Sequence, residues 1–182
     1  MIPLDLNTFF NCPVPNADFY LNPDNYPVLN NHPLYPPEIK PWLEIPHLEE
    51  SECNRLTKFI DPPAHFHIDW CATLFRKGNS LPPHLDVEGV LHNEVYARII
   101  IWVTPPEFEG REFVWGSIKD PIPGVLGYGW NHPNLTEVGR IKPRTGLGYI
   151  LDIQNPNIYH GVTELTSETP VASILGSVIY RK

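Results

Sequence analysis

The stretch from His67 to Val103 decides how this chain folds. It contains HIDWCATLF (67–75), RKGN (76–79), PPHLDV (82–87) and YARIIIWV (96–103). The first and last of these segments are rich in β-branched and aromatic residues, which favour strands. Gly78 and Asn79 are residues that favour turns. This stretch therefore predicts successive β-strands, in which PPHLDV returns as a strand after the turn.

Strand-like segments continue toward the C-terminus as GREFVWGS (110–117), GYILDI (148–153), YHGVTEL (159–165) and PVASILGSVIY (170–180). Short strands separated by Gly, Pro and Asn turns predict a mainly β double-sheet fold, either a sandwich or a barrel. The Gly- and Pro-rich stretch 119–143 is too long for a tight turn, so we expect a long loop there.

The N-terminal third has a different composition. Prolines recur between Pro13 and Pro46 and exclude a long helix, because each removes a backbone donor. The aromatic residues among them predict a segment that wraps along the domain. HLEESECNRLTKFID (47–61) has helical spacing of apolar residues and ends before Pro62. We expect one domain over 1–182, with the wrap and helix in 1–62 and a β core in 63–182.

Charge and length exclude several classes of protein. The chain has 182 residues, a net charge of −8 and 42% hydrophobic residues. No apolar run approaches the ~20 residues of a membrane helix, and the acidic balance argues against a nucleic-acid binder. The start lacks a basic region and the three cysteines form no metal or disulfide motif, so a cytoplasmic protein is expected. No GxSxG or Walker motif occurs, and nothing in the sequence indicates an oligomeric state.

The pair His84 and Asp86 is the sharpest chemical signal. Side chains two apart on a strand point to the same face. An imidazole and a carboxylate are two of the three ligands in the facial triad of non-haem Fe(II) sites, which leaves open coordination positions. His160 is available on a distant strand as the third ligand. A solvent-facing pair without metal is the alternative, and His65 with His67 forms a weaker alternating set.

In their order along the chain, four segments resemble the 2-oxoglutarate- and Fe(II)-dependent dioxygenases, including prolyl-hydroxylase-like and jumonji-like members. The segments are LFRKGNSLPPHLD (74–86), EGREFVWGS (109–117), KPRTGLGYILD (142–152) and YHGVTEL (159–165). The resemblance implies a double-stranded β-helix, or jelly roll, with His84, Asp86 and His160 as Fe(II) ligands. It also implies 2-oxoglutarate and O₂ as co-substrates, and hydroxylation of an unactivated C–H bond in a small molecule or peptide residue.

The sequence departs from the family where a cation grips the far carboxylate of 2-oxoglutarate. Many members carry Arg or Lys about ten residues after the distal histidine, where this chain has Pro170; Ser173 does fit the pattern. A dianion in a dry pocket needs a cation. Arg98, alone in an apolar strand, is one candidate, and Arg144, in a turn, is the weaker one. An outward-facing Arg98 with an apolar stem is the alternative.

Aromatic residues of the predicted strands line the pocket or fill the core; the pocket candidates are Tyr96, Trp102, Trp115 and Tyr149. Because the usual cation is missing, an iron enzyme that does not use 2-oxoglutarate, or a cupin-like metalloenzyme, stays open. A third possibility is a non-catalytic jelly-roll binding or structural protein, in which His84 and Asp86 never meet His160.

Overall fold

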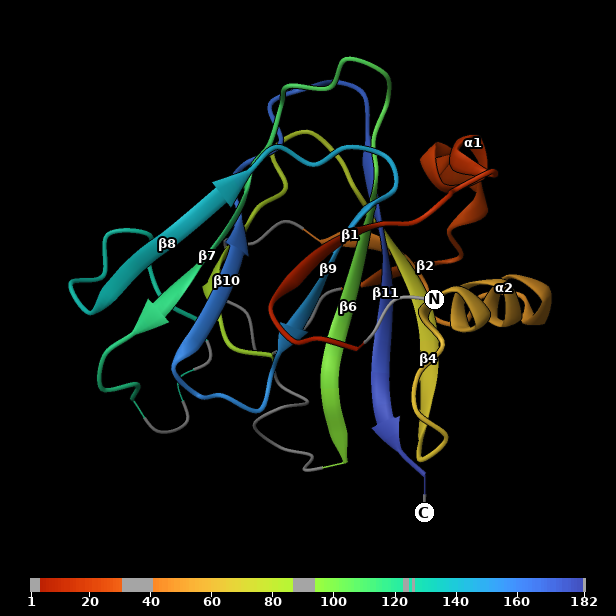
Figure 1. Ribbon diagram of the computed structural model, residues 1–182. Helices are drawn as coiled ribbons and strands as arrows, with labels where there is room; N and C mark the ends of the chain where they lie inside the picture. Colours follow the sequence, from red (N-terminus) through yellow and green to blue (C-terminus); the bar gives the residue numbers. More distant parts are fainter. Residues whose placement is uncertain (1–3, 31–40, 87–93, 123–124, 126, 182) are drawn as a thin grey trace.

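Two antiparallel sheets face each other in the computed structural model, which describes residues 4–30, 41–86, 94–122, 125 and 127–181 (Figure 1). The larger sheet has the order β1-β9-β6-β11-β4-β3-β2. Its strands are β1 (Thr8–Asn11), β2 (Val28–Asn30), β3 (Trp42–Ile45), β4 (Phe66–Phe75), β6 (Val95–Val103), β9 (Leu147–Asp152) and β11 (Val171–Tyr180). The smaller sheet, β5-β10-β7-β8, contains β5 (Leu81–His84), β7 (Phe113–Ile118), β8 (Leu135–Ile141) and β10 (Ile158–Val162).

The path of the chain between the sheets defines the fold. From β4 onward it alternates between the larger and the smaller sheet, except that β7 and β8 are consecutive neighbours in the smaller one. The strands β9-β6-β11-β4 and β5-β10-β7-β8 therefore form the eight-stranded core of a jelly roll. The predicted mainly β, double-stranded β-helix is confirmed.

The strand that carries the histidine and aspartate is shorter than the sequence predicted. β5 ends at His84, so Asp86 follows the strand instead of lying within it, and the remainder of the predicted strand lies outside the described residues. Pro82 and Pro83 lack the N–H groups that would extend a ladder. The pairing with β10 accordingly contains His84 and Leu81, with a register shift between them.

The predicted loop 119–143 contains a strand, which corrects that expectation. β8, with the sequence LTEVGRI, pairs with β7 at the edge of the smaller sheet. Most of its side chains are exposed or half-buried, so it lacks the apolar face by which a strand is found in a sequence. Charged residues such as Glu137 and Arg140 are common on edge strands, because they discourage pairing with other chains.

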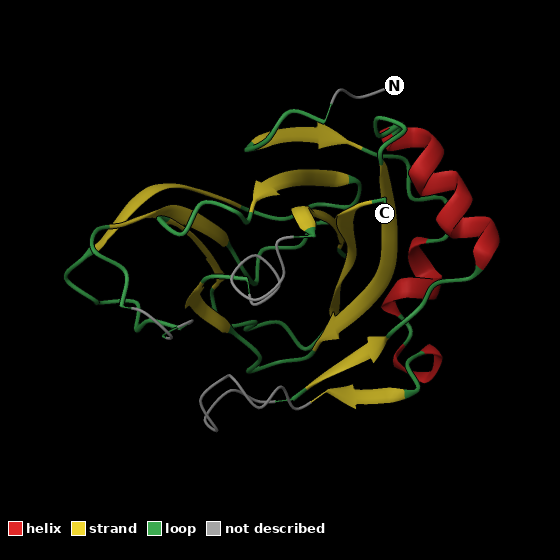
Figure 2. Cartoon of the chain, turned by 90° about the horizontal axis from the view of Figure 1, so that it is seen from below, coloured by secondary structure: helices red, strands yellow, loops and turns green. Residues whose placement is uncertain are grey.

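The proline-rich N-terminal segment adds strands to both edges of the larger sheet: β1 pairs with β9, and β3 pairs with β4. Between them lie the short helix α1 (Ala17–Leu21) and a 3₁₀ turn (Pro23–Asn25). The predicted helix is α2 (Glu50–Ile60), which ends at Asp61 in the left-handed conformation, immediately before two prolines. Figure 2 shows the helices on the outer face of the larger sheet.

Alternation along β6 assigns its side chains to two different environments. Ile99 and Ile101 pack with Leu56 and Ile60 of α2 in the core beneath the helices. Ile100 and Trp102 face the interior between the sheets. Arg98 has the same parity as Ile100 and lines the cavity between the sheets, so the alternative of an outward-facing Arg98 does not hold. No helix among the described residues is long and apolar enough to cross a membrane.

Candidate metal centre

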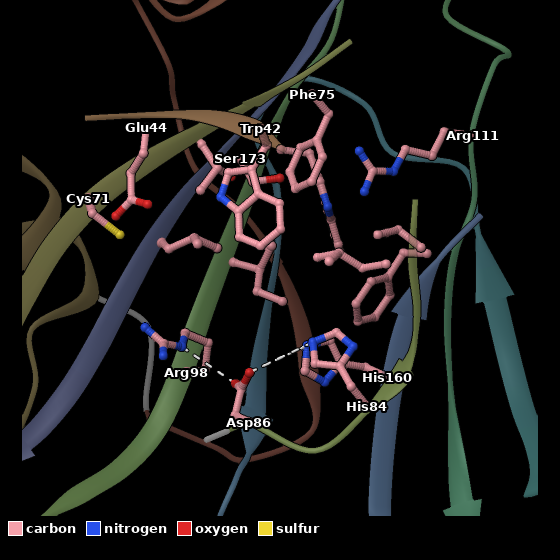
Figure 3. Close-up of a pocket in the computed structure, with 17 residues that line it drawn as sticks. Trp42, Glu44, Cys71, Phe75, His84, Asp86, Arg98, Arg111, His160 and Ser173 are labelled. Carbon is pink, nitrogen blue, oxygen red and sulfur yellow. Dashed lines mark hydrogen bonds and ion pairs between the residues drawn. The ribbon is translucent and has the colours of Figure 1, made fainter. Parts of the chain in front are cut away.

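The three predicted ligand residues converge at one end of the space between the sheets (Figure 3). His84 on β5 and His160 on β10 are direct cross-strand partners, and their ring centroids lie 4.2 Å apart. The Nε2 atom of each ring lies 3.9 Å from Oδ1 of Asp86. The potential ligand atoms of the three residues all lie within 4.8 Å of one another, and no other such group of three occurs in the described ranges.

This donor set fits a divalent transition metal. Nitrogen and oxygen ligands bind such an ion at about 2.1 Å, so two atoms on one ion lie at most about 4.2 Å apart. The 3.9 Å separations fall inside that limit. Two imidazoles and one carboxylate on one side of an ion leave its other positions open, which suits non-haem Fe(II).

Local contacts set the protonation states that metal binding requires. Nδ1 of His84 lies 2.8 Å from the carbonyl oxygen of Pro82, and only a protonated nitrogen can donate there. The lone pair is therefore on Nε2, facing Asp86. Burial lowers the pKa of His160 to about 3, so this ring is neutral at physiological pH. Burial also disfavours ionisation of Asp86, but the neighbouring imidazoles and Arg98 outweigh it and hold the Asp86 pKa below its usual value.

A cavity of about 200 Å³ extends from this triad between the two sheets. Its walls come from both sheets, and within the larger sheet the N-terminal strand β3 contributes Trp42 and Glu44. Of the predicted residues, Arg98, Ser173 and Trp102 line it. Arg98, however, is already engaged within the protein: its Nε lies 3.5 Å from Oδ2 of Asp86, and its Nη1 donates to Ser177 Oγ at 2.6 Å.

A second cation, which sequence reasoning missed, lines the same cavity away from the triad (Figure 3). Arg111 precedes β7 and is 4% exposed. Its Nε has no hydrogen-bond partner, and its guanidinium carbon lies 4.0 Å from the centre of the Phe75 ring. Burial lowers the pKa of Arg111 to about 9, which leaves it charged at neutral pH. The signal was its parity with Phe113 and Trp115, which puts a cation on an inward-facing apolar run.

Unsatisfied polar atoms are concentrated in this cavity. Within the part of the chain that the structure describes, three buried side-chain atoms lack a partner: Thr73 Oγ1, Arg111 Nε and His160 Nδ1. All three residues line the cavity. Thr73 on β4 is the cross-strand neighbour of Ser173 on β11, so two hydroxyls share this wall. Buried polar groups without partners are rare in folded proteins, so the Arg111 and Thr73 side chains are candidates for hydrogen bonds to a ligand in the cavity.

Four predicted residues do not line the cavity. Arg144 is exposed in the turn before β9. Trp115 and Tyr149 lie in the interior but pack against Phe9. Tyr96 is on the opposite face of the larger sheet, stacked against Phe66.

A register shift explains the position of Tyr96. β11 pairs Val178 with Ala97 and Ile179 with Val95, so Tyr96 is an extra residue in its strand. A bulge of this kind reverses the side-chain alternation that would otherwise place Tyr96 on the face of Arg98. The weaker histidine set also lies elsewhere, since His67 and Asp69 form an exposed pair 3.9 Å apart.

No protein-family model and no curated protein sequence matches this chain. It is similar to a prolyl-4-hydroxylase from Pseudomonas putida, with 11% identity and a TM-score of 0.43 over 64% of this chain and 53% of that one. The comparison with SnoN, a non-haem α-ketoglutarate-dependent epimerase from nogalamycin biosynthesis, gives 17% identity and a TM-score of 0.47 over 64% of this chain and 52% of that one. It is also similar to YcfD, a ribosomal oxygenase from Escherichia coli in complex with cobalt and 2-oxoglutarate. That comparison gives 18% identity and a TM-score of 0.43 over 84% of this chain and 35% of that one. The chain spans about half the length of the first two of these proteins and about a third of the length of the third.

Proposed function

We propose that this chain is an Fe(II)- and 2-oxoglutarate-dependent oxygenase that hydroxylates an unactivated C–H bond of a small molecule or peptide residue. The observation that carries the proposal is one cavity with a His-Asp-His triad at one end and, elsewhere in its wall, a buried arginine whose Nε has no hydrogen-bond partner among the described residues. A ligand with a metal-binding group and a distant carboxylate satisfies both.

Each part of the cavity has a defined task in this proposal. His84, Asp86 and His160 hold the iron, which together with 2-oxoglutarate supplies the oxidising chemistry when bound. Arg111 pairs with the far carboxylate of 2-oxoglutarate, and the hydroxyls of Thr73 and Ser173 donate to the same carboxylate. The apolar walls, including Phe75 and Trp102, exclude water and so strengthen these charge interactions.

Arg111 therefore replaces Arg98 and Arg144 as the proposed partner of 2-oxoglutarate. Arg98 is committed to Asp86 and Ser177, and Arg144 is outside the cavity. Arg111 has a donor without a partner, which makes it the cation with bonding capacity to offer. The convergence of His84 and Asp86 with His160 supports a metal site over a non-catalytic binding protein in which these residues stay apart.

The test is the formation of succinate from 2-oxoglutarate with Fe(II) and O₂, for the wild type, His84→Ala, Asp86→Ala and Arg111→Met. We expect turnover in the wild type and none in the first two variants; turnover that survives Asp86→Ala contradicts the triad. Anaerobic addition of 2-oxoglutarate to the Fe(II) protein separates the alternatives. A visible charge-transfer band supports the proposal, and its absence in a protein that holds iron supports a 2-oxoglutarate-independent iron enzyme.

A further inference from the structure

The two carboxylate oxygens of Asp86 face different groups. Oδ1 lies 3.9 Å from Nε2 of both His84 and His160, so it faces the position where the three ligands converge. Oδ2 lies 3.5 Å from Nε of Arg98. A carboxylate with one oxygen held by a cation offers the other oxygen to a metal, and it then occupies one coordination position instead of two.

Arg98 is in turn fixed from the adjacent strand. Ser177 on β11 is its direct cross-strand partner, and Ser177 Oγ accepts a hydrogen bond of 2.6 Å from Nη1. The side chains of Arg98 and Asp86 are 10% and 11% exposed, so the pair is largely shielded from solvent. A planar guanidinium fixed at one nitrogen presents its other donors in a defined direction.

Asp86 needs such support more than the two histidines do. His84 ends β5 and His160 lies within β10, so both have backbones in the sheet, and His84 also contacts Pro82. Asp86 lies two residues beyond the end of its strand. The Arg98 guanidinium is therefore the contact that ties the Asp86 side chain to the larger sheet.

We propose that Arg98 is a positioning residue for Asp86. Arg98, fixed by Ser177, holds Oδ2 of Asp86, so that Asp86 would bind the metal through Oδ1 alone and occupy a single coordination position. This inference rests on the metal site of the proposed function. Arg98 itself touches neither the metal nor 2-oxoglutarate, which distinguishes this role from that of a carboxylate partner.

The test measures metal affinity and 2-oxoglutarate affinity separately, with Co(II) as the metal probe. Co(II) binding is followed by its visible absorption and by calorimetry for the wild type, Arg98→Met, Arg98→Lys and Ser177→Ala. Arg140→Met is the matched control, because Arg140 also pairs with carboxylates, Glu137 and Glu112, but on the exposed face of β8. Circular dichroism establishes that each variant folds.

In Arg98→Met we expect Co(II) affinity to fall roughly 10- to 100-fold, as when other groups that hold metal ligands are removed. Arg98→Lys retains part of that affinity, Ser177→Ala loses roughly threefold at most, and Arg140→Met matches the wild type. The visible spectrum of Co(II) changes in Arg98→Met because Asp86 is free to bind through both oxygens. With metal saturating, 2-oxoglutarate affinity stays within about threefold of the wild type.

Unchanged Co(II) affinity in Arg98→Met overturns the inference, and a selective loss of 2-oxoglutarate affinity assigns Arg98 to the co-substrate instead. If Arg98→Met does not fold, Arg98→Lys and Ser177→Ala decide in the same way, and wild-type affinity in both overturns it. A wild type that binds no Co(II) rejects the proposed metal site and this inference with it. A wild type that binds Co(II) but not 2-oxoglutarate rejects the proposed co-substrate and leaves the role of Arg98 to be decided by the metal titration.

Discussion

Two arginines lie in the wall of one cavity, and their surroundings are opposite. Arg98 has an anionic partner, Asp86, and a hydroxyl partner, Ser177. Arg111 lies over the Phe75 ring and has a donor without a partner. A buried cation that is paired with a carboxylate is stabilised within the protein, whereas a buried cation with an unsatisfied donor costs free energy until an anion binds it. Of the two guanidinium groups, that of Arg111 therefore has a donor to offer to a ligand.

The largest expected effect on stability comes from Asp86→Ala, which removes the carboxylate partner of Arg98. Asp86→Ala leaves Arg98 buried without a counterion, and the free energy of unfolding of the metal-free protein should fall by about 3 kcal/mol, as for a broken buried ion pair. Chemical denaturation measures this change. The same variant should retain no stoichiometric Co(II). An unchanged stability would show that Arg98 reaches solvent, and the contrast between the two arginines would fail.

Replacing Arg111 should lower the affinity for 2-oxoglutarate, whereas replacing Asp86 lowers the stability of the protein. In Arg111→Met, 2-oxoglutarate should lose about 2–3 kcal/mol of binding free energy, or roughly 30- to 150-fold in Kd, because charge-assisted hydrogen bonds to its carboxylate are lost. Calorimetry on the Co(II)-loaded protein measures this loss. Arg144→Met serves as the comparison, since Arg144 is exposed in a turn. Equal losses in the two variants would refute the assignment of Arg111.

Acidification should destabilise the triad end of the cavity in the metal-free protein. His84, Asp86 and Arg98 face His160, whose pKa is lowered to about 3 chiefly by burial. An unfolded histidine takes up a proton near pH 6.5, so between about pH 6.5 and 3 the unfolded state binds more protons and is favoured. Stability should therefore fall by about 2 kcal/mol between pH 7.5 and 5. Thermal unfolding across this range measures it, and His160→Gln should flatten the dependence.

Arg111→Met should stabilise the ligand-free protein, which is the opposite sign to Asp86→Ala. Replacing an unsatisfied buried cation by an apolar side chain of similar length should raise the free energy of unfolding by about 1 kcal/mol or more. The expected rise in Tm is about 2–4 °C for each kcal/mol. A lower Tm in this variant would mean that the contact with Phe75 outweighs the burial of the charge.

The smallest effect concerns Thr73, whose buried hydroxyl also lacks a partner. Thr73→Val keeps the shape of the side chain and removes its polar atom. The free energy of unfolding of the ligand-free protein should therefore change by less than about 1 kcal/mol. Affinity for 2-oxoglutarate should fall roughly 2- to 10-fold if the hydroxyl donates to the carboxylate. Wild-type affinity in Thr73→Val would leave Ser173 as the hydroxyl that contacts the ligand.

Much of the β core could be predicted, because the amino-acid composition of its strands is itself typical of β-structure. β4, β6 and β11 are runs of β-branched and aromatic residues, and their bounds differ by about one residue from the segments chosen by composition. β8 has no apolar face, so it was expected as loop. Tyr96, a pocket candidate, lies on the opposite face of the sheet because a bulge, which composition does not reveal, adds one residue to its strand.

The three residues that can bind a metal, His84, Asp86 and His160, could be named from the amino-acid sequence, because they belong to recognisable strand motifs. Alternation also indicated that Arg98 shares a face with Ile100 and Trp102, but only the packing of the two sheets showed that this face is the inner one. Which of the two arginines keeps an unsatisfied donor among the described residues became visible only once the sheets were in place. The surroundings of an arginine depend on residues from other segments of the chain, the Asp86 carboxylate for Arg98 and the Phe75 ring for Arg111, and these meet only when the two sheets pack face to face.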